Sequence, residues 1–490
     1  MTAALSSATP LLARGEPAAQ VQAAFARLRD GARIEPHPSA AAREDRLRRL
    51  ERSLQLHTDD IIHAVDADFR GRARIETLYA DVLHPIEAIR ELRKKLAGWM
   101  KPLPVEPVWY FRPSTARVEY QPKGVVGILS PWNYPVNLAL IPLAEAIAAG
   151  NRALLKPSEL APRTSELLAR ILGETFAADE VAVVLGGPDV ARAVTELPLD
   201  HLIFTGSTAV GREVARTAAG NLVPATLELG GKSPVIISPT FALERAAERI
   251  AYGKLFNAGQ TCIAPDYALV PAGRERHFAD AFKAYVARQW GDLAKSPDYT
   301  AIATERHRDR LEALLSEAAD AGARVVRVDP HASLQQREAK MAPALVFDPP
   351  LGSRLMQEEI FGPILPIIAY RGLDAAIDFV NARPRPLALY LFEENAAQAA
   401  DVLKRTWAGG ACVNDVLLHF AQHDLPFGGI GPSGMGAYHG FEGFRTLSHP
   451  KPVFAANGLS AMRFLVPPYP SFVERGLRAL IGGKRRRPGS

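Results

Sequence analysis

The sequence lacks the cysteines that a disulfide framework or a cysteine-rich metal site requires. Its 490 residues include only Cys262 and Cys412, so we expect no bound metal and a reducing compartment such as the cytoplasm. Long apolar runs are also missing, since none approaches the roughly 20 residues of a membrane-spanning helix. Residues 1–15 have neither the basic start nor the apolar core of a secretory signal. The sequence therefore predicts a soluble protein without a transmembrane segment.

A large excess of one charge is missing as well. Lys and Arg number 58 and Asp and Glu number 53, which gives a formal net charge of +5. So small an excess on so long a chain predicts no broad basic surface, and we expect no nucleic-acid partner. The run Lys484–Arg487 concentrates positive charge near one end of the sequence. A solvated tail is the main interpretation of this run, and a contact with nucleic acid or an anionic membrane is the alternative.

The first part of the chain contains two kinds of pattern. Over 17–102, apolar residues recur at helical spacing among Arg and Glu. In the following stretch, 102–122, Val118 and Tyr120 alternate with polar neighbours, which predicts an exposed strand suited to pairing between subunits. The clearest helical stripe predicts a core-facing surface and consists of Leu47, Leu50, Leu54 and Ile61.

A regular alternation of short apolar runs and amphipathic stretches follows. It predicts strands over 124–130, 153–155, 181–185 and 201–205, with helices over 138–149, 165–176 and 190–197. Such alternation is typical of βαβ units, in which helices cover both faces of a parallel sheet. A second α/β series extends from about 233 to 410, so we expect two α/β lobes. Its predicted helices are 242–257, 275–290, 307–321 and 395–407, and its strands lie near 266–271, 324–329 and 364–369.

Cys262 is a candidate nucleophile. It follows the predicted helix 242–257 in a turn that contains Gly259. The thiolate is the reactive form of cysteine and only a few per cent of an ordinary thiol is ionised at neutral pH, so a catalytic cysteine needs positive charge or a base nearby. Packing in a core is the other interpretation of a lone cysteine, and we assign that role to Cys412.

Glu228 is a candidate general base. It is flanked by Leu227 and Leu229 at the end of an apolar run, which predicts a partly buried carboxylate. Burial raises a carboxyl pKa towards neutrality, where a general base works best. An ion pair, for instance with Lys232, is the alternative interpretation.

Two polar segments follow predicted strands, at the edge where open α/β sheets bind ligands. Asn133 follows the strand 124–130, and its amide is suited to donate to a developing oxyanion, although a simple turn residue is the alternative. Lys156 and Glu159 follow the strand 153–155. Together they could hold the two hydroxyls of a ribose, and a surface turn with a helix cap is the alternative.

The segment 204–212 is rich in glycine and follows a strand. Its Gly206 and Gly211 open a helix, so that backbone N–H groups would face an anion such as a pyrophosphate. The spacing is not that of the GxGxxG motif. Arg212 and Glu213 stand where a Walker A loop has Lys and Ser or Thr, which excludes a kinase or ATPase of that type.

Taken together, these segments resemble the aldehyde dehydrogenase superfamily over nearly the whole chain. The residues 264–267 and 434–440 are most similar to the class 3 branch and to the bacterial coniferyl aldehyde dehydrogenases near it. The matching motifs, in order, are PWNYP (131–135), KPSE (156–159), FTGSTAVGR (204–212), LELGGK (227–232), GQTC (259–262), EEIFGP (358–363) and LPFGGIGPSGMG (425–436).

The resemblance implies a role for each motif. Cys262 would be the nucleophile and Glu228 the general base, while Asn133 and the backbone N–H of Cys262 would form an oxyanion hole. The cofactor would be NAD by preference, because the charge of Glu159 repels the 2′-phosphate of NADP, with NADP also accepted as in class 3 relatives. The cofactor site would comprise Trp132, Lys156, Ser158, Glu159, Gly206, Ser207, Gly211, Leu229, Glu359 and Phe361, with Glu359 on the nicotinamide ribose and Phe361 against the nicotinamide.

The resemblance also implies an α/β aldehyde dehydrogenase fold and a homodimer. Residues 1–104 and 123–231 would form a Rossmann-like cofactor-binding domain, and 232–411 an α/β catalytic domain. Segments 105–122 and 412–455 would serve oligomerisation and bridging, and 456–490 would be a C-terminal extension with the basic tail.

The substrate would be an aromatic aldehyde such as coniferyl aldehyde, and a medium- or long-chain aliphatic aldehyde is the alternative. Aromatic and imidazole side chains near the C-terminal lobe are suited to a pocket for such molecules, although core packing is the other interpretation. A CoA-acylating dehydrogenase is an alternative function, and the presence of Glu228 favours water as the acyl acceptor instead. A catalytically inactive binding protein is a further alternative, which the presence of Cys262 and Asn133 disfavours. The side chains considered for the pocket are His419, Phe420, Phe427, Tyr438 and His439.

Overall fold

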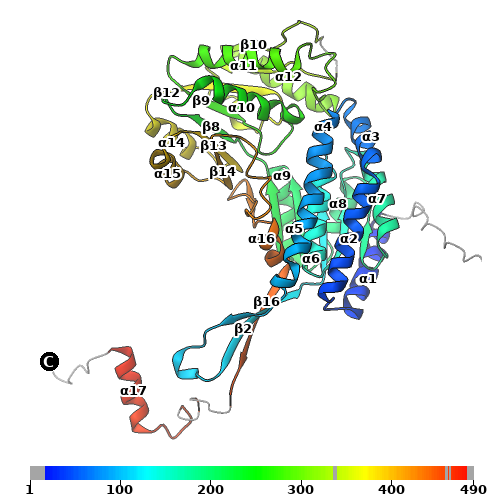
Figure 1. The fold of residues 1–490 in the computed structure, drawn as a ribbon, viewed down its shortest axis with the longest axis vertical. Coiled ribbons are helices and arrows are strands. Elements are labelled where there is room, and N and C mark those ends of the chain that lie inside the picture. Colours follow the sequence, from blue (N-terminus) through cyan, green and yellow to red (C-terminus); the bar gives the residue numbers. More distant parts are fainter. Residues whose placement is uncertain (1–16, 335–338, 458–461, 463–464, 483–490) are drawn as a thin grey trace, which may run out of the picture. The chain divides into compact units, whose positions relative to one another are not determined.

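The computed structural model describes residues 17–334, 339–457, 462 and 465–482, so the basic run Lys484–Arg487 lies outside the described residues. The chain divides into two compact units. The first holds Met1–Ala97 and Pro122–Ser448, and the second holds Gly98–Gln121 and His449–Ser490. The first unit contains two mainly parallel sheets with helices around them (Figure 1), which confirms the predicted α/β fold of two lobes.

A six-stranded sheet forms the centre of one lobe, with the strand order β15-β7-β6-β3-β4-β5. All neighbouring strands are parallel except β15, which is antiparallel to β7. From β3 the chain proceeds to β4 and β5 in one direction, and from β6 to β7 in the other. The order thus reverses between β3 and β6, which is where open parallel sheets bind ligands. The elements are β3 (Val125–Leu129), α6 (Asn137–Ala148), β4 (Arg152–Lys156), α7 (Pro162–Thr175), β5 (Val181–Val183), α8 (Pro188–Thr195), β6 (His201–Gly206), α9 (Thr208–Gly220), β7 (Ala225–Leu229) and β15 (Gly434–Met435).

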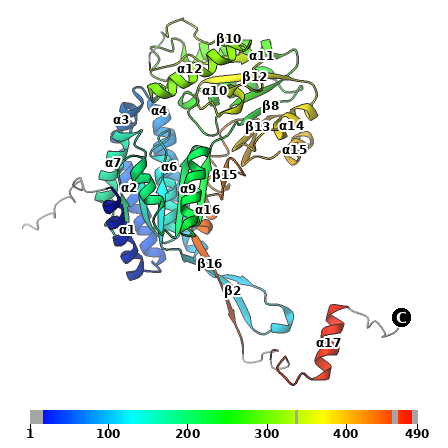
Figure 2. The ribbon, with the colours of Figure 1, turned by 180° about the vertical axis from the view of Figure 1, so that it is seen from behind.

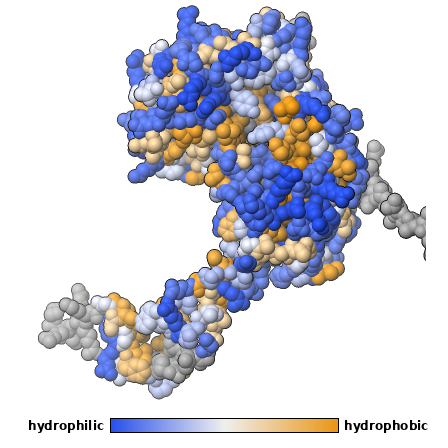
Figure 3. Space-filling model, in the orientation of Figure 1, coloured by the Kyte–Doolittle hydropathy of each residue, from blue (hydrophilic) through white to orange (hydrophobic). Residues whose placement is uncertain are grey.

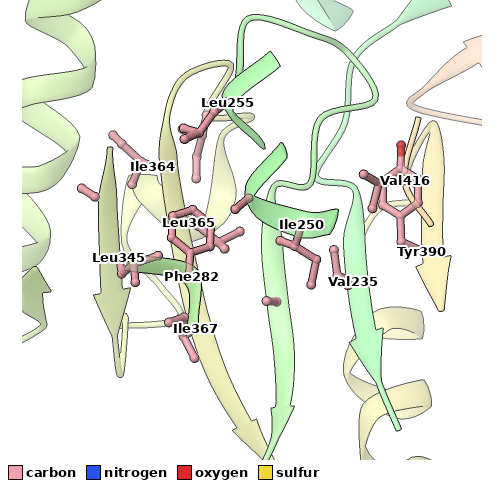
Figure 4. Packing of buried hydrophobic residues seen from close by; sticks show 14 of the residues in the cluster. Val235, Ile250, Leu255, Phe282, Leu345, Ile364, Leu365, Ile367, Tyr390 and Val416 are labelled. Carbon is pink, nitrogen blue, oxygen red and sulfur yellow. The ribbon is translucent and has the colours of Figure 1, made fainter. Parts of the chain in front are cut away.

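The second sheet has seven strands, in the order β10-β11-β12-β9-β8-β13-β14, and only β10 is antiparallel to its neighbour. Alternate residues of β9 enter two different apolar clusters, Ala268 and Val270 on one face and Tyr267 and Leu269 on the other. Figure 4 shows the first cluster, in which Phe282 from α11 packs over the strands. The elements are β8 (Pro234–Ile237), α10 (Leu243–Leu255), β9 (Tyr267–Pro271), α11 (Glu275–Trp290), α12 (Glu305–Asp320), β10 (Arg324–Arg327), β11 (Ala344–Phe347), α13 (Arg354–Gln357), β12 (Ile364–Tyr370), α14 (Leu373–Asn381), β13 (Ala388–Phe392), α15 (Ala396–Arg405) and β14 (Gly410–Val413).

The N-terminal helices pack against the six-stranded sheet and its helices. In both views α2, α3 and α7 lie side by side (Figures 1 and 2), and α2 also contacts α6. The predicted core stripe is confirmed, because Leu47, Leu50, Leu54 and Ile61 are at most 1% exposed. The helices are α1 (Pro17–Ile34), α2 (Ala40–Leu56), α3 (Thr58–Phe69), α4 (Arg74–Thr77), the π-helix η1 (Leu78–Leu83) and α5 (His84–Trp99).

The second unit is built on a three-stranded sheet with the order β1-β2-β16. The strand predicted from Val118 and Tyr120 is present as β2 (Thr115–Pro122), and β1 (Leu103–Val105) pairs with it in antiparallel register. Because β2 is the central strand, both of its edges pair within the chain, and it is not itself free to pair with another subunit as predicted. The remaining elements are the 3-10 helix η2 (Trp109–Phe111), β16 (Ser448–Ala455) and α17 (Ser471–Ile481). Among the described residues of both units, no helix is long and apolar enough to cross a membrane.

Candidate active site

A tight turn after α10 positions Cys262. The helix ends at Leu255 rather than at the predicted residue 257, because Asn257 and Ala258 adopt left-handed backbone angles with φ of 52° and 50°. Gly259 continues the turn with a φ of 74°, and a Cβ atom there would lie 2.4 Å from the Gly362 carbonyl oxygen. Only glycine fits such a position. The 3-10 turn η3 (Phe256–Gly259) therefore ends the helix and delivers the chain to Cys262.

Gln260 fixes this loop to the second lobe. Its buried amide donates from Nε2 to the Ala301 carbonyl over 3.0 Å and accepts at Oε1 from the Ala303 N–H over 2.9 Å. A side-chain amide satisfied at both ends inside the protein holds its backbone firmly. The position of Cys262, two residues further on, is therefore set by buried hydrogen bonds and not by a mobile surface turn.

The Cys262 side chain is half-buried and lines a pocket. Burial raises the pKa of the thiol, and the charges of Glu359 and Glu228 raise it further, whereas backbone hydrogen bonds lower it. The thiol is therefore protonated in this environment and must lose its proton when it reacts, since only the thiolate is a strong nucleophile. The two carboxyl groups that act on it belong to the motifs singled out in the sequence.

Asn133 lies against the Cys262 loop. Its side-chain Nδ2 donates to the Gln260 backbone carbonyl over 3.1 Å. The backbone carbonyl of Asn133 accepts from Asn257 Nδ2 over 3.0 Å and from the Arg72 guanidinium over 3.1 Å. An amide nitrogen carries two hydrogens, so one remains for another acceptor. The structure thus brings together two segments that are more than a hundred residues apart in the sequence, and it provides a donor beside the cysteine loop.

Glu228 lies on β7 and is only 3% exposed. Neither of its carboxyl oxygens has a hydrogen-bond partner among the described residues. The ion pair with Lys232, which the sequence left open, is absent from the described contacts, because the Lys232 ammonium contacts Asp266 and donates to the Leu355 carbonyl over 2.8 Å. Burial raises the pKa of Glu228 well above its ordinary value, and the charge of Glu145 adds to the shift. A buried carboxyl without a partner is suited to exchange a proton with a ligand or a water molecule.

The pocket at Cys262 is apolar and aromatic, with an empty volume of about 700 Å³ including its open mouth. Figure 3 shows apolar surface over the region of α4 and η1, where Leu78 and Leu83 are exposed. Of the side chains considered from the sequence, Phe420 lines the pocket, whereas Phe427 and Tyr438 are buried in the main apolar cluster. The other aromatic and imidazole side chains of the lining are Tyr79, His84, Tyr134, Tyr252 and Phe256.

Sequence reasoning missed most of this lining, because it comes from η1, α5, α6 and the end of α10. Tyr79 and His84 lie in a helical stretch whose spacing predicts only core packing. Tyr134 lies in the PWNYP motif next to Asn133, so its place in the motif could have indicated a position in the site. Its hydroxyl forms a hydrogen bond of 2.7 Å with the Thr261 hydroxyl, so it belongs to the site.

The predicted cofactor residues of the six-stranded sheet stand at the carboxyl ends of its strands. Lys156 ends β4, and its ammonium pairs with Glu159 over 2.5 Å, while Ser158 between them is buried. After β6, Ser207 caps α9 by accepting from the Val210 N–H over 3.4 Å. A capped helix N-terminus beside an ammonium and a carboxylate fits the pyrophosphate and ribose of a dinucleotide.

Gly206 and Gly211 allow close packing at the same edge. A Cβ atom on Gly211 would lie 2.5 Å from Cδ2 of Leu229, so glycine lets α9 approach β7. A Cβ atom on Gly206 would lie 2.5 Å from the Phe204 ring. Both glycines therefore have a packing role that the sequence motif alone did not reveal.

Glu359 and Phe361 come from the loop before β12. Glu359 Oε1 is buried without a partner among the described residues, and burial, with the charge of Asp266, raises the pKa of Glu359 to about 8. Phe361 adopts a φ of 54° and meets Trp132 edge-on at 5.6 Å between ring centroids. A carboxyl with one oxygen unpartnered among the described residues and a half-buried aromatic ring are suited to the second ribose and base of a dinucleotide. The residues present thus fit such a cofactor.

His, Cys, Asp and Glu side chains form no metal-binding group within the part of the chain that the structure describes. Cys412 lies on β14, opposite Tyr390 in register, and packs against the main apolar cluster. Burial raises the pKa of its thiol to about 11. Its surroundings are those of a packing residue.

Comparison with known proteins points to one family. The model described as "Aldehyde dehydrogenase family" matches residues 12–453. A coniferyl aldehyde dehydrogenase of Pseudomonas sp. is 47% identical over 415 residues, which cover 84% of this chain and 86% of the relative. The substrate-bound state of Staphylococcus aureus AldH superposes with a TM-score of 0.87 at 35% identity, covering 94% of this chain and 99% of the other. A Mycobacterium tuberculosis aldehyde dehydrogenase complexed with NAD+ gives 0.80 at 27% identity, with 91% and 92% covered.

Proposed function

The chain belongs to the aldehyde dehydrogenase family, and from this membership we propose that it oxidises an aromatic aldehyde, such as coniferyl aldehyde, to the carboxylic acid through a thioester on Cys262. One observation carries the proposal. Cys262 lines an apolar, aromatic pocket and lies within electrostatic reach of the buried, unpartnered carboxyl of Glu228. A nucleophile with a base close enough to affect it is what a two-stage oxidation requires.

In the first stage, the Cys262 thiol passes its proton to water, and the sulfur adds to the aldehyde carbon. The remaining N–H of the Asn133 amide and the backbone N–H of Cys262 stabilise the alkoxide that forms, a contribution of about 3–4 kcal/mol for one such donor. When bound, a nicotinamide cofactor would supply the hydride acceptor that the collapse of the alkoxide requires. The product of this stage is a thioester on Cys262.

In the second stage, Glu228 accepts a proton from a water molecule, and the resulting hydroxide attacks the thioester. The C–S bond breaks, the carboxylic acid leaves, and the sulfur of Cys262 is restored. A raised carboxyl pKa supports this role of Glu228, because a stronger base takes the proton of water more readily. The Lys156–Glu159 pair, the N-terminus of α9 and Glu359 would hold the cofactor, with NAD preferred over NADP because Glu159 repels a 2′-phosphate.

The lining of the pocket supports a flat, aromatic substrate. Tyr79, Tyr134 and Phe256 line it and pack on one another, with Phe256 edge-on to Tyr79 and stacked on Tyr134, and the Pseudomonas relative is named for coniferyl aldehyde. The test is cofactor reduction with coniferyl aldehyde, cinnamaldehyde and hexanal at matched concentrations. We expect kcat/KM to be at least about tenfold higher for the two aromatic aldehydes. A preference for hexanal would move the substrate to aliphatic aldehydes.

We also propose that the chain forms a homodimer through the second unit. Its outer strands, β1 and β16, each have one edge without a strand partner in the described chain. Unpaired edges readily add a further strand, so the same sheet of a second copy is a suitable partner. Light scattering tests this, since a dimer has twice the 53.1 kDa of one chain, and a monomeric mass would remove the proposal.

A further inference from the structure

The pocket contains an imidazole that the proposed reaction does not use. His84 begins α5, lines the pocket and is 7% exposed. Three rings hold it: Tyr79 at 6.0 Å, Phe420 at 5.4 Å and His423 at 5.0 Å between centroids. Its Nδ1 has no hydrogen-bond partner in the part of the chain that the structure describes. A buried polar nitrogen without a partner is unfavourable, so a ligand that forms a hydrogen bond with this ring removes that penalty.

Asn137 supplies a second unpartnered group to the same pocket. It is 2% exposed and lines the pocket from the first residue of α6. Its Nδ2 donates to the Ala80 carbonyl over 2.6 Å, and its backbone N–H donates to Asp81 over 3.1 Å. Because a rotated amide would set two oxygens against each other at Ala80, this contact fixes the orientation. Its Oδ1 is left as an acceptor without a partner among the described residues.

The two groups complement each other chemically. Burial, with the charge of His423, lowers the pKa of His84 to about 4, so the ring is neutral at neutral pH and carries one N–H and one lone pair. The Asn137 oxygen can only accept. A hydroxyl group both donates and accepts, so it can satisfy both side chains at once. An aldehyde without such a group leaves both of them unpaired.

A series of ring contacts places His84 away from the nucleophile. Tyr134 bonds to Thr261, the neighbour of Cys262, and stacks on Phe256 at 6.4 Å. Phe256 meets Tyr79 edge-on at 6.4 Å, and Tyr79 in turn meets His84. These rings form one continuous side of the pocket. When the carbonyl of a flat aldehyde reaches Cys262 and its ring lies along these side chains, the far end of the aldehyde therefore points towards His84.

We propose that His84 and Asn137 form a subsite for a phenolic hydroxyl at the end of an aromatic aldehyde remote from its carbonyl group. This inference rests on the proposed oxidation at Cys262 and deepens it. The hydroxyl donates to Asn137 Oδ1 and accepts from the imidazole N–H. The subsite thus selects hydroxylated aromatic aldehydes over unsubstituted ones.

The experiment compares kcat/KM for para-hydroxycinnamaldehyde and cinnamaldehyde. We expect wild-type protein to favour the hydroxylated substrate by about ten- to a hundredfold. His84→Phe, which keeps an aromatic ring of similar shape, should lose most of that preference by slowing on the hydroxylated substrate alone, and His84→Asn should restore part of it. His423→Phe is the matched control, because His423 packs on His84 outside the pocket lining, and it should keep the wild-type ratio.

The outcomes separate the two proposals. Equal ratios for wild type and His84→Phe, with good turnover of both aldehydes, would overturn the subsite and leave the oxidation intact. No turnover of any aldehyde by wild type would overturn the proposed function itself. A second experiment needs no variant and measures inhibition of the wild type by para-hydroxycinnamate and by cinnamate. Tighter inhibition by the hydroxylated acid supports the subsite, and equal inhibition contradicts it.

Discussion

The backbone N–H of His439 donates a hydrogen bond of 2.9 Å to the Glu145 carboxyl group, which is fully enclosed between α6 and α16 (Gly440–Thr446). The second oxygen of Glu145 has no hydrogen-bond partner among the described residues. Gly443 makes room for it, since a Cβ atom there would lie 2.1 Å from that oxygen. Burial raises the pKa of Glu145 well above its ordinary value. The folded protein therefore holds a proton that the unfolded chain releases at lower pH.

This relationship gives a prediction for stability. A carboxyl whose pKa is raised on folding contributes stability below its unfolded pKa, and that contribution is lost as the pH rises through the folded pKa. Glu145→Gln removes this dependence. The thermal midpoint of Glu145→Gln minus that of the wild type should increase from about pH 5 to about pH 9. The increase should be equivalent to about 1 kcal/mol or more in the free energy of unfolding. Glu196→Gln, at an exposed site, is the control and should show no such change. If the thermal midpoints of the two variants depend on pH in the same way, the raised pKa of Glu145 is contradicted.

Glu228→Gln tests the second stage of the reaction. Because the glutamine cannot take a proton from water, thioester hydrolysis should slow by about 10²–10⁴ while thioester formation continues. Rapid mixing should show a burst of reduced cofactor, stoichiometric with the enzyme, followed by a slow steady state. If the burst and the steady-state rate decrease by the same factor, Glu228 acts in the first stage instead.

The pH dependence of thioester hydrolysis follows from the same carboxyl group. Glu228 must be ionised to act as a base, and its raised pKa keeps it protonated in mildly acidic solution. The hydrolysis rate should therefore increase with pH through the neutral range rather than level off near about pH 5, where an ordinary carboxyl is already ionised. The decay of pre-formed acyl-enzyme across a pH series measures this, and a flat profile would refute the role of burial.

We expect cofactor preference to depend on Glu159. Wild type should use NAD more efficiently than NADP, because the carboxylate repels a 2′-phosphate. Glu159→Gln should raise kcat/KM for NADP by about tenfold or more and change that for NAD far less. Wild-type use of NADP at least about tenfold more efficiently than NAD would contradict this prediction.

The strand-end motifs could be located from the sequence, because the alternation of strands and helices dictates which residues follow each strand. Lys156 and Glu159 stand where that alternation predicts, and the two-lobed α/β fold is confirmed. Glu145 could not be foreseen, since it lies within an apolar helical run and its partner, His439, is almost three hundred residues away.

The pocket was the least predictable part of the site. Its lining joins η1, α5, α6 and the turn after α10, and no spacing in one segment reports on contacts with another. His84 illustrates this, because helical periodicity makes it a packing residue and only the fold brings it near the Cys262 pocket. The partner of Lys232 was equally hidden, because Asp266 reaches it from a different segment.

The role of Cys262 as the nucleophile is tested most directly by cofactor reduction with coniferyl aldehyde in Cys262→Ala and Cys412→Ala, compared with wild type. The two variants remove the same atoms from the only two cysteines of the chain, so each serves as the control for the other. We expect Cys262→Ala to lose all measurable activity and Cys412→Ala to keep at least about half. Full activity in Cys262→Ala would contradict the thioester mechanism and the site built around it.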